Sequence, residues 1–260
     1  MKHFALSALA TAALLGAACG GASPPPSPAP VAAAPPSPAP HVVADAALPA
    51  APRARCARRR PGEGALPAAP VRQSSPIALA RLGDRTLAYV ADEDEGAVHT
   101  LDLDARSEIA LTPLAGAPTH LLVLADGRVA VALREGNRVV ILEPAAAPGA
   151  PLEERCSVAV AVEPVALALT PDDRRLLVSS GYGHTLTALA EADLRTLFTV
   201  DLPREPRAVT TSDDGRRAFL THVVGGALSI VDLDDGAARA PRSLDLRVGH
   251  RVGGVPRVPG

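Results

Sequence analysis

The feature that most constrains the fold of this chain is an internal repeat of 42 to 46 residues. The segment that begins at Pro206 has three partial copies upstream, which begin at Pro76, Pro118 and Pro164 and give spacings of 42, 46 and 42 residues. A period of this length is typical of one four-stranded blade of a β-propeller. The repeat therefore predicts an all-β fold with four visible four-stranded blades.

Each copy contains the same order of apolar segments and turns. An inner strand follows the proline, an Asp- or Gly-containing turn comes next, and a second, a third and an outer strand complete the unit. The inner strands are expected at 77–80, 121–124, 165–169 and 208–211, and the second strands at 88–91, 130–133, 176–179 and 218–221. The third strands are expected at 98–103, 139–143, 186–189 and 228–233, and the outer strands at 108–111, 157–162, 197–200 and 243–248. A helical fold is not expected, because apolar residues do not recur every three or four positions.

The composition of the repeat region limits the partners that the chain can have. Residues 72–260 carry 20 arginines against 26 acidic residues, so nucleic acid is not expected as the main partner. Aromatic residues make up 2% of the chain and tryptophan is absent, which leaves almost no side chains on which bases or sugars could stack. The core must be built from aliphatic residues.

The first nineteen residues have the order of an export signal. Lys2 and His3 precede an apolar stretch over residues 4–15, and small residues lead from there to Cys19. The apolar stretch is too short to span a bilayer comfortably, so a permanent transmembrane helix is the weaker interpretation.

The segment Leu-Gly-Ala-Ala-Cys-Gly at 15–20 resembles a bacterial lipoprotein signal. The resemblance implies lipidation of Cys19, which would anchor the mature chain to a membrane. Gly16 departs from the pattern, because a leucine is usual at that position. Plain secretion with an unmodified Cys19 is the alternative. Both interpretations predict an exported protein, either a membrane-anchored lipoprotein or a periplasmic one.

Residues 20–71 are predicted to be a disordered linker between the signal and the repeats. The first seventy residues hold 14 of the 27 prolines, and residues 22–52 are almost wholly Pro, Ala, Ser and Val, a composition that favours extended polyproline II. The arginine-rich stretch 53–60 is interpreted as a solvated basic linker, with contact to anionic head groups or a partner's acidic face as the alternative. The propeller repeats occupy 72–248, and 249–260 form a C-terminal tail.

Two cysteines remain once Cys19 is assigned to lipid. Cys56 lies in the linker and Cys156 at the start of an apolar run, and a disulfide between them is plausible in an oxidising compartment. Whether the two residues approach each other is left open by the sequence. The chain has no CxxCH motif, so covalent c-type haem is not supported and no cofactor is expected.

The second strands, read as Tyr-Val-Ala-Asp at 89–92 and Phe-Leu-Thr-His at 219–222, resemble the YVTN-type bacterial β-propeller repeat. The proline before the inner strand, the Asp-Gly turn and Ile-Val-Asp-Leu at 230–233 strengthen the resemblance, which covers residues 76–248. It implies a propeller fold and says little about activity. Some proteins of this type accompany c-type cytochromes or haem peroxidases, and some propellers hydrolyse lactones.

Propellers that the chain resembles generally close about seven blades, whereas four repeats are visible here. Three accounts remain open: a C-terminally truncated product, a compact four-bladed ring, and an open half-propeller completed by a second copy. An open array would leave apolar faces on its first and last blades, so self-association would be expected.

Alignment of the repeats places Asp92, Arg134, Ser180 and His222 in one column at the end of the second strand. Equivalent positions of radiating blades form a ring, so these side chains are candidates for a shared binding site, together with His184 in the third repeat. Each also has a structural interpretation, and a hydrogen-bonded strand-end histidine is favoured over a metal ligand for His222. No catalytic or metal-binding residue is predicted.

The sequence favours a cell-envelope binding or scaffold protein without catalysis of its own. Blade tops are expected to recognise an envelope protein or a small ligand, because rigid blades hold short loops on one face. The alternative is part of a redox propeller enzyme, associated with cytochrome c or haem peroxidase, or of a lactone-hydrolysing one. This alternative follows from the resemblance alone.

Overall fold

The computed structural model describes residues 56–57, 66–67, 71–145, 149–233 and 241–246. Contacts divide the chain into two units, Met1–Pro38 and Ala39–Gly260, and all described residues belong to the second unit. They form seventeen strands and no α-helix. Accordingly, no membrane-spanning helix of sufficient length and hydropathy occurs among them. The export signal with Cys19, and the tail at 249–260, lie outside the described residues.

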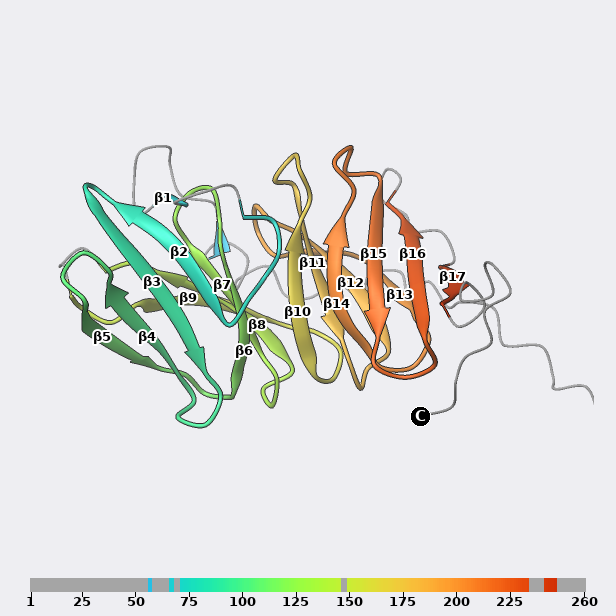
Figure 1. Ribbon diagram of the computed structural model, residues 1–260, viewed down its shortest axis with the longest axis horizontal. Coiled ribbons are helices and arrows are strands. Elements are labelled where there is room, and N and C mark those ends of the chain that lie inside the picture. Colours follow the sequence, from blue (N-terminus) through green and yellow to red (C-terminus); the bar gives the residue numbers. More distant parts are fainter. Residues whose placement is uncertain (1–55, 58–65, 68–70, 146–148, 234–240, 247–260) are drawn as a thin grey trace, which may run out of the picture. The chain divides into compact units, whose positions relative to one another are not determined.

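The strands form four antiparallel sheets that follow one another along the chain (Figure 1). The first sheet contains β1 (Leu66–Pro67), β2 (Ile77–Leu82), β3 (Arg85–Asp92), β4 (Ala97–Asp102) and β5 (Ser107–Pro113). The second contains β6 (Pro118–Val123), β7 (Val129–Leu133), β8 (Arg138–Glu143) and β9 (Glu153–Ala159). The third contains β10 (Pro164–Leu169), β11 (Arg175–Ser180), β12 (Thr185–Ala190) and β13 (Thr196–Asp201). The fourth contains β14 (Pro206–Thr211), β15 (Arg217–His222), β16 (Ala227–Asp232) and β17 (Arg242–Asp245).

The predicted all-β architecture of four repeated units is confirmed. Within each unit, consecutive strands pair with their neighbours in sequence order, as short hairpin connections require. The inner strands β6, β10 and β14 begin at the repeat prolines Pro118, Pro164 and Pro206. Proline fits this position because the first residue of an edge strand does not need to donate a hydrogen bond to a neighbour.

The predicted position of one outer strand is wrong. The sequence places it at 157–162, whereas β9 covers Glu153–Ala159. Pairing with β8 sets this position, since Glu143 lies opposite Glu153 and Ile141 lies opposite Cys156. The prediction followed apolar content, but an outer strand faces solvent on one side and therefore accommodates charged residues such as Glu153.

Layers of mainly aliphatic side chains separate neighbouring sheets. Tyr89 and Leu121 are buried in the layer between the first and second sheets, and Ile141 and Leu167 in the layer between the second and third. Leu220 belongs to the layer between the third and fourth sheets. Burial of these side chains supplies the main favourable free energy of the fold, because each removes apolar surface from water.

The segment before the first repeat lies along the inner edge of the sheets. The backbone amides of Leu169 and Ser74 donate to the carbonyls of Arg72 and Leu167, both at 2.8 Å, so this segment adds to the edge of β10. Ser75 exchanges backbone hydrogen bonds of 3.3 and 2.9 Å with Leu121 in β6. Arg72–Ser75 therefore joins the second and third sheets on their inner side.

Two short pieces of the predicted disordered linker 20–71 are built into the folded unit, which corrects the predicted domain boundary for them. β1 pairs with β2, and Cys56 is buried in the layer between the second and third sheets, where it forms a disulfide with Cys156 in β9. A covalent bond and a strand pairing hold these pieces where composition alone predicted disorder.

A buried arginine completes this attachment. The Arg128 side chain is 1% exposed, and its guanidinium donates to Asp126 Oδ2 at 2.7 Å, to the Cys56 carbonyl at 2.6 Å, and to a Glu191 carboxylate oxygen. Asp126 and Arg128 come from the second sheet and Glu191 from the third. Burying a guanidinium is costly unless it is paired and hydrogen-bonded, and here these groups compensate it.

Candidate functional site

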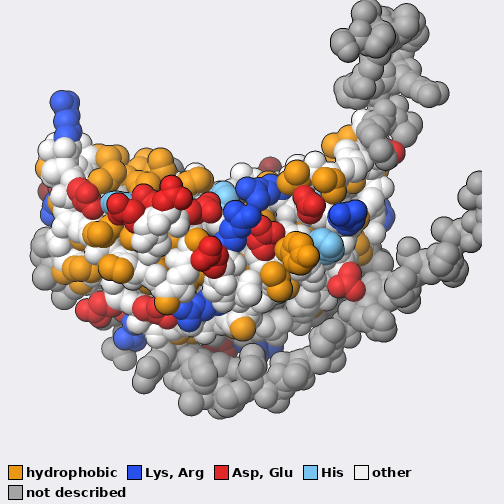
Figure 2. All heavy atoms as spheres, turned by 90° about the horizontal axis from the view of Figure 1, so that it is seen from below, with side chains coloured by type: hydrophobic (Ala, Val, Ile, Leu, Met, Phe, Trp, Pro, Cys, Tyr) orange, Lys and Arg blue, Asp and Glu red, His pale blue; other side chains and the backbone are white. Residues whose placement is uncertain are grey.

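The four side chains of the predicted column lie at the same end of their sheets. Asp92, Ser180 and His222 are the last residues of β3, β11 and β15, and Arg134 directly follows β7. Figure 2, which views the molecule from below, shows acidic side chains gathered over the half that contains the first sheet, with basic side chains beside them.

Ser180 and His222 bind the connections that lead into their own sheets. The Ser180 hydroxyl is buried and donates to the Ala161 carbonyl at 3.1 Å. His222 Nδ1 lies 2.9 Å from the Arg204 carbonyl, and its Nε2 lies 2.8 Å from the Ser229 hydroxyl. Because a carbonyl only accepts, Nδ1 donates the hydrogen bond to Arg204. Both His222 nitrogens are therefore occupied by structural hydrogen bonds.

Arg134 forms ion pairs on both sides of its sheet. Its guanidinium donates from Nε to Glu163 at 2.9 Å, and its Nη1 lies 3.6 Å from a carboxylate oxygen of Glu93. Glu163 lies in the connection to the third sheet and Glu93 in the turn after Asp92. These contacts link neighbouring sheets, and they do not bring Arg134 together with Ser180 or with His222.

His184 lies in the turn between β11 and β12, where its φ is 51°. Its carbonyl accepts a hydrogen bond of 2.7 Å from the Leu202 amide. Its ring lies 6.3 Å from the ring of Tyr182, which is 74% exposed. The residue thus shapes a turn, and the structure shows no contact between it and the column residues.

Three potential cation ligands meet at the first sheet. Ligand atoms of Asp92, Glu95 and His99 lie within 4.8 Å of one another, and His99 Nε2 lies 3.6 Å from a carboxylate oxygen of each acid. His99 Nδ1 lies 2.9 Å from a carboxylate oxygen of Glu108. The hydrogen bond to Glu108 raises the pKa of His99, opposed by desolvation and assisted by the three carboxylates. A protonated His99 is itself a cation for these acids, and the same atoms could hold a metal ion.

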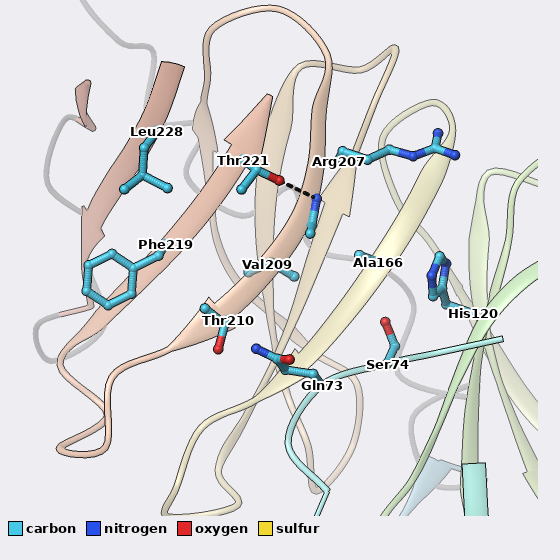
Figure 3. A pocket seen from close by; sticks show the side chains of 11 residues that line it. Gln73, Ser74, His120, Ala166, Arg207, Val209, Thr210, Phe219, Thr221 and Leu228 are labelled. Carbon is cyan, nitrogen blue, oxygen red and sulfur yellow. Dashed lines mark hydrogen bonds between the residues drawn. The ribbon is translucent and has the colours of Figure 1, made fainter. Parts of the chain in front are cut away.

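A hollow of about 390 Å³ opens at the inner strands of the second, third and fourth sheets and extends onto the face of the fourth sheet that points away from the third. Its lining comes from the inner strands of these sheets, from β15 and β16, and from the segment before the first repeat (Figure 3). The lining residues are Gln73, Ser74, His120, Ala166, Arg207, Ala208, Val209, Thr210, Phe219, Thr221 and Leu228.

Local backbone geometry places the two basic residues of the hollow. Each inner strand from β6 onwards has an irregular register just after its repeat proline: between Pro118 and His120 in β6, and between Pro206 and Val209 in β14. The same irregularity follows Pro164 in β10. Such bulges turn side chains away from the regular alternation of a strand. His120 and Arg207 lie at two of these bulges.

The electrostatics of the hollow are set by Arg207 and His120. Burial lowers the pKa of His120, the nearby Arg207 lowers it further, and Glu93 and a backbone hydrogen bond to Val165 oppose these effects. His120 is therefore neutral near pH 7. Its Nδ1 is buried without a hydrogen-bond partner in the described part of the chain. Arg207 remains as the charged group of the lining.

Comparison with known proteins establishes the fold. No family model and no curated protein matches the chain. Among solved structures, the Pseudomonas aeruginosa periplasmic gluconolactonase is similar with a TM-score of 0.57 and 18% identity over 66% of this chain and 55% of that one. The four sheets are propeller blades. The Kuenenia stuttgartiensis hydrazine synthase is similar with a TM-score of 0.52 and 17% identity over 61% of this chain and 46% of that one.

A third similar structure, the dihydro-haem d1 dehydrogenase NirN in complex with DHE, has a TM-score of 0.50 and 21% identity over 62% of this chain and 35% of that one. This chain thus spans between about a third and just over half of the length of these three propeller chains. Identities this low establish the fold and leave the activity open.

Sequence reasoning did not select the residues that line the hollow. A signal for one of them was present, because His120 stands two residues after a repeat proline, as Ala78, Ala166 and Ala208 do in the other blades. Comparison of that column would have shown one histidine among three alanines on the inner strands. His99 and Glu108 were likewise missed as neighbours of Asp92 and Glu95, because they come from β4 and β5.

Proposed function

We propose that this chain is an exported, lipid-anchored β-propeller protein that binds a small ligand on the inner side of its blades without catalysing a reaction. The observation that carries the proposal is the hollow of about 390 Å³, which lies within the size range of small-molecule sites. Its walls are β-strands of three blades, so its polar and apolar groups are held at fixed positions.

Two features support export. The first is the signal-like order of residues 1–19, with Cys19 as the expected site of lipidation. The second is the disulfide between Cys56 and Cys156, because such bonds form and persist in oxidising compartments outside the cytoplasm. A Cys19→Ser variant tests the anchor: we expect it to move from the membrane fraction to the soluble periplasmic fraction. Retention in the membrane fraction would overturn lipid anchoring at this residue.

The binding role is supported by the way the column residues are used. Ser180 and His222 hold the connections between blades through hydrogen bonds, and Arg134 links blades through ion pairs. These side chains make the ends of the blades rigid. Rigid blade ends are useful for recognition, because little conformational entropy of the protein is lost when a ligand binds.

The test is ligand-dependent stabilisation that requires an open hollow. We expect some component of a small-molecule extract of the cell envelope to raise the melting temperature of the wild-type protein and to be recovered chemically unchanged. Ala208→Trp, which fills the hollow, should abolish this shift. Ala192→Trp, at an exposed turn of the third blade, should not. Stabilisation that survives in the Ala208→Trp variant would contradict binding in the hollow.

An enzymatic role is a second candidate, and one observation favours it. His120 lines the hollow with a lowered pKa, as a general base near neutral pH would need, and one similar structure is named a periplasmic gluconolactonase. A lactone added to the wild-type protein would then be hydrolysed. Loss of that activity in His120→Gln, with an unchanged melting temperature, would favour the enzyme over the binding protein.

A further inference from the structure

We propose that the ligand of the hollow is a small organic monocarboxylate, whose carboxylate binds Arg207 beside His120 and whose apolar body lies against Phe219 and Leu228. This inference deepens the proposed binding function and rests on it. It assigns the charge class and the shape of the ligand.

The first argument is the charge of the lining. The eleven lining residues include one arginine and no carboxylate. Arg207 makes no ion pair with any other described residue, whereas Arg134 at the same end of the blades pairs with Glu93 and Glu163. Glu93 influences His120 less than Arg207 does. The hollow therefore presents an arginine whose charge is not compensated within the described part of the chain.

The second argument is the geometry of that arginine. A guanidinium presents its N–H donors in a planar fork that matches the two oxygens of a carboxylate. Arg207 lies at the bulge in β14, which is fixed by the pairing of Pro206 with His222 and of Val209 with Leu220. The Ala208 amide also donates to the Thr221 hydroxyl at 3.4 Å. The backbone that carries Arg207 is thus held by the neighbouring strand.

The number of charges distinguishes monoanions from dianions. His120 is neutral near pH 7, for the reasons given above, so Arg207 is the one full positive charge among the lining residues. Arg207 is exposed at the edge of the hollow, and a phosphate or a dicarboxylate would bring a second negative charge for which the lining holds no second cation. A monocarboxylate is matched by Arg207 alone.

The third argument is the distribution of polar and apolar groups. Figure 3 shows Arg207 and His120 on one side of the hollow and Phe219 and Leu228 on the opposite side. Val209 and Thr210 lie between them, and Gln73 lines the lower part of the view. A ligand that spans the hollow therefore needs an anionic end and an apolar end. The volume, near the lower limit for ligand sites, favours a small molecule.

The experiment uses two probes of nearly equal size, 3-phenylpropanoate and 3-phenylpropanamide, in which an uncharged amide replaces the carboxylate, titrated into the full chain by isothermal calorimetry or NMR. We expect the acid to bind at least about tenfold more tightly than the amide, because hydrogen bonds to charged groups are stronger than neutral ones. Arg207→Gln should reduce the affinity for the acid to that for the amide. Arg195→Gln, an exposed arginine outside the lining, should leave it unchanged.

The outcomes separate the inference from the proposed function. Equal binding of acid and amide, abolished by Ala208→Trp, would overturn the charge class while the hollow remained a binding site. Absence of binding by 3-phenylpropanoate at millimolar concentration would overturn the monocarboxylate assignment, and the extract experiment would still decide the binding role. An unchanged affinity for the acid in Arg207→Gln would also overturn the assignment, provided that the variant keeps the wild-type melting temperature.

Discussion

The inner strands β10 and β14 occupy equivalent positions in the third and fourth blades, and their environments differ. All six residues of β10 are buried, whereas in β14 only Pro206 and Val209 are. Two features cause the difference: the third blade packs against a blade on each side, whereas the fourth packs against the third alone among the described residues, and Arg72–Ser75 binds the inner edge of β10, with hydrogen bonds to Leu167 and Leu169. The comparison teaches that the place of a blade in the array and the covering segment Arg72–Ser75 together decide which inner strand is closed and which borders the hollow.

The buried guanidinium of Arg128 joins the second and third blades through Asp126 and Glu191, so its removal should have the largest effect on stability. Arg128→Ala leaves the carboxylates of Asp126 and Glu191 without this buried cation, and we expect the free energy of unfolding to fall by about 3–5 kcal/mol. Urea denaturation measures this. Arg217→Ala, which removes an exposed pair with Asp232 in the fourth blade, should cost about 0–1 kcal/mol. Equal losses in the two variants would remove the contrast between the blades.

Removal of the disulfide should cause the second largest loss of stability. Replacing Cys56 and Cys156 together by serine frees the linker piece from β9, and we expect a loss of about 2–4 kcal/mol in the free energy of unfolding. Wild-type protein in reductant should show the same loss, whereas the double variant should not respond to reductant. A wild-type protein whose urea midpoint is unaffected by reductant would contradict a structural role for this bond.

A smaller loss of stability is expected when the covering segment, Arg72–Ser75, loses one hydrogen bond to β10. The Ser74 hydroxyl accepts a hydrogen bond of 2.7 Å from the Leu167 amide. Ser74→Ala should cost about 1 kcal/mol, and it should speed the hydrogen exchange of that amide. Ser243→Ala, at an exposed position in β17, is the matched control and should change neither quantity. Faster exchange at Leu167 in the control variant would argue against a local effect of Ser74.

The smallest expected effect is a change in the free energy of unfolding with pH, which comes from Asp102 in the first blade. The Ala105 amide and the Arg85 guanidinium, followed by the Asp104 amide, lower the pKa of Asp102 from its usual value of 3.8. A lowered pKa stabilises the fold above about pH 4, and this contribution is lost as the pH falls through the value in the folded state. The stability difference between wild type and Asp102→Asn should therefore shrink between pH 6 and pH 2.5 in urea titrations. A difference that stays constant would show that Asp102 does not contribute through its charge.

Much of the fold could be predicted from the sequence, because the repeat places each proline, turn and strand by local pattern. The inner strands begin at the repeat prolines Pro118, Pro164 and Pro206, one to three residues before the predicted starts. The shifted outer strand β9 could not be predicted, since its register depends on pairing with β8. The position of Arg72–Ser75 could not be predicted either, because its polar residues carry no strand pattern and its partners, Leu121, Leu167 and Leu169, lie in later blades.

The candidate site was less predictable, because its contacts also depend on partners from other parts of the chain. The column of Asp92, Arg134, Ser180 and His222 was placed correctly at one end of the blades, but its partners are mainly backbone carbonyls and carboxylates of the connections. Side-chain identity gives no signal for such partners. The hollow depends on which inner edge is left uncovered, and this is a property of the folded chain.

Hydrogen exchange at the two inner edges tests the central claim most directly. Leu167 and Leu169 donate their amides to the covering segment, and Val209 and Thr211 hold the equivalent positions in β14. The account predicts strong protection for Leu167 and Leu169 and exchange at least about tenfold faster for Val209 and Thr211, since edge amides without a partner open easily. Equal protection of both pairs would show that β14 is covered as well, and the hollow would then not be open to a ligand.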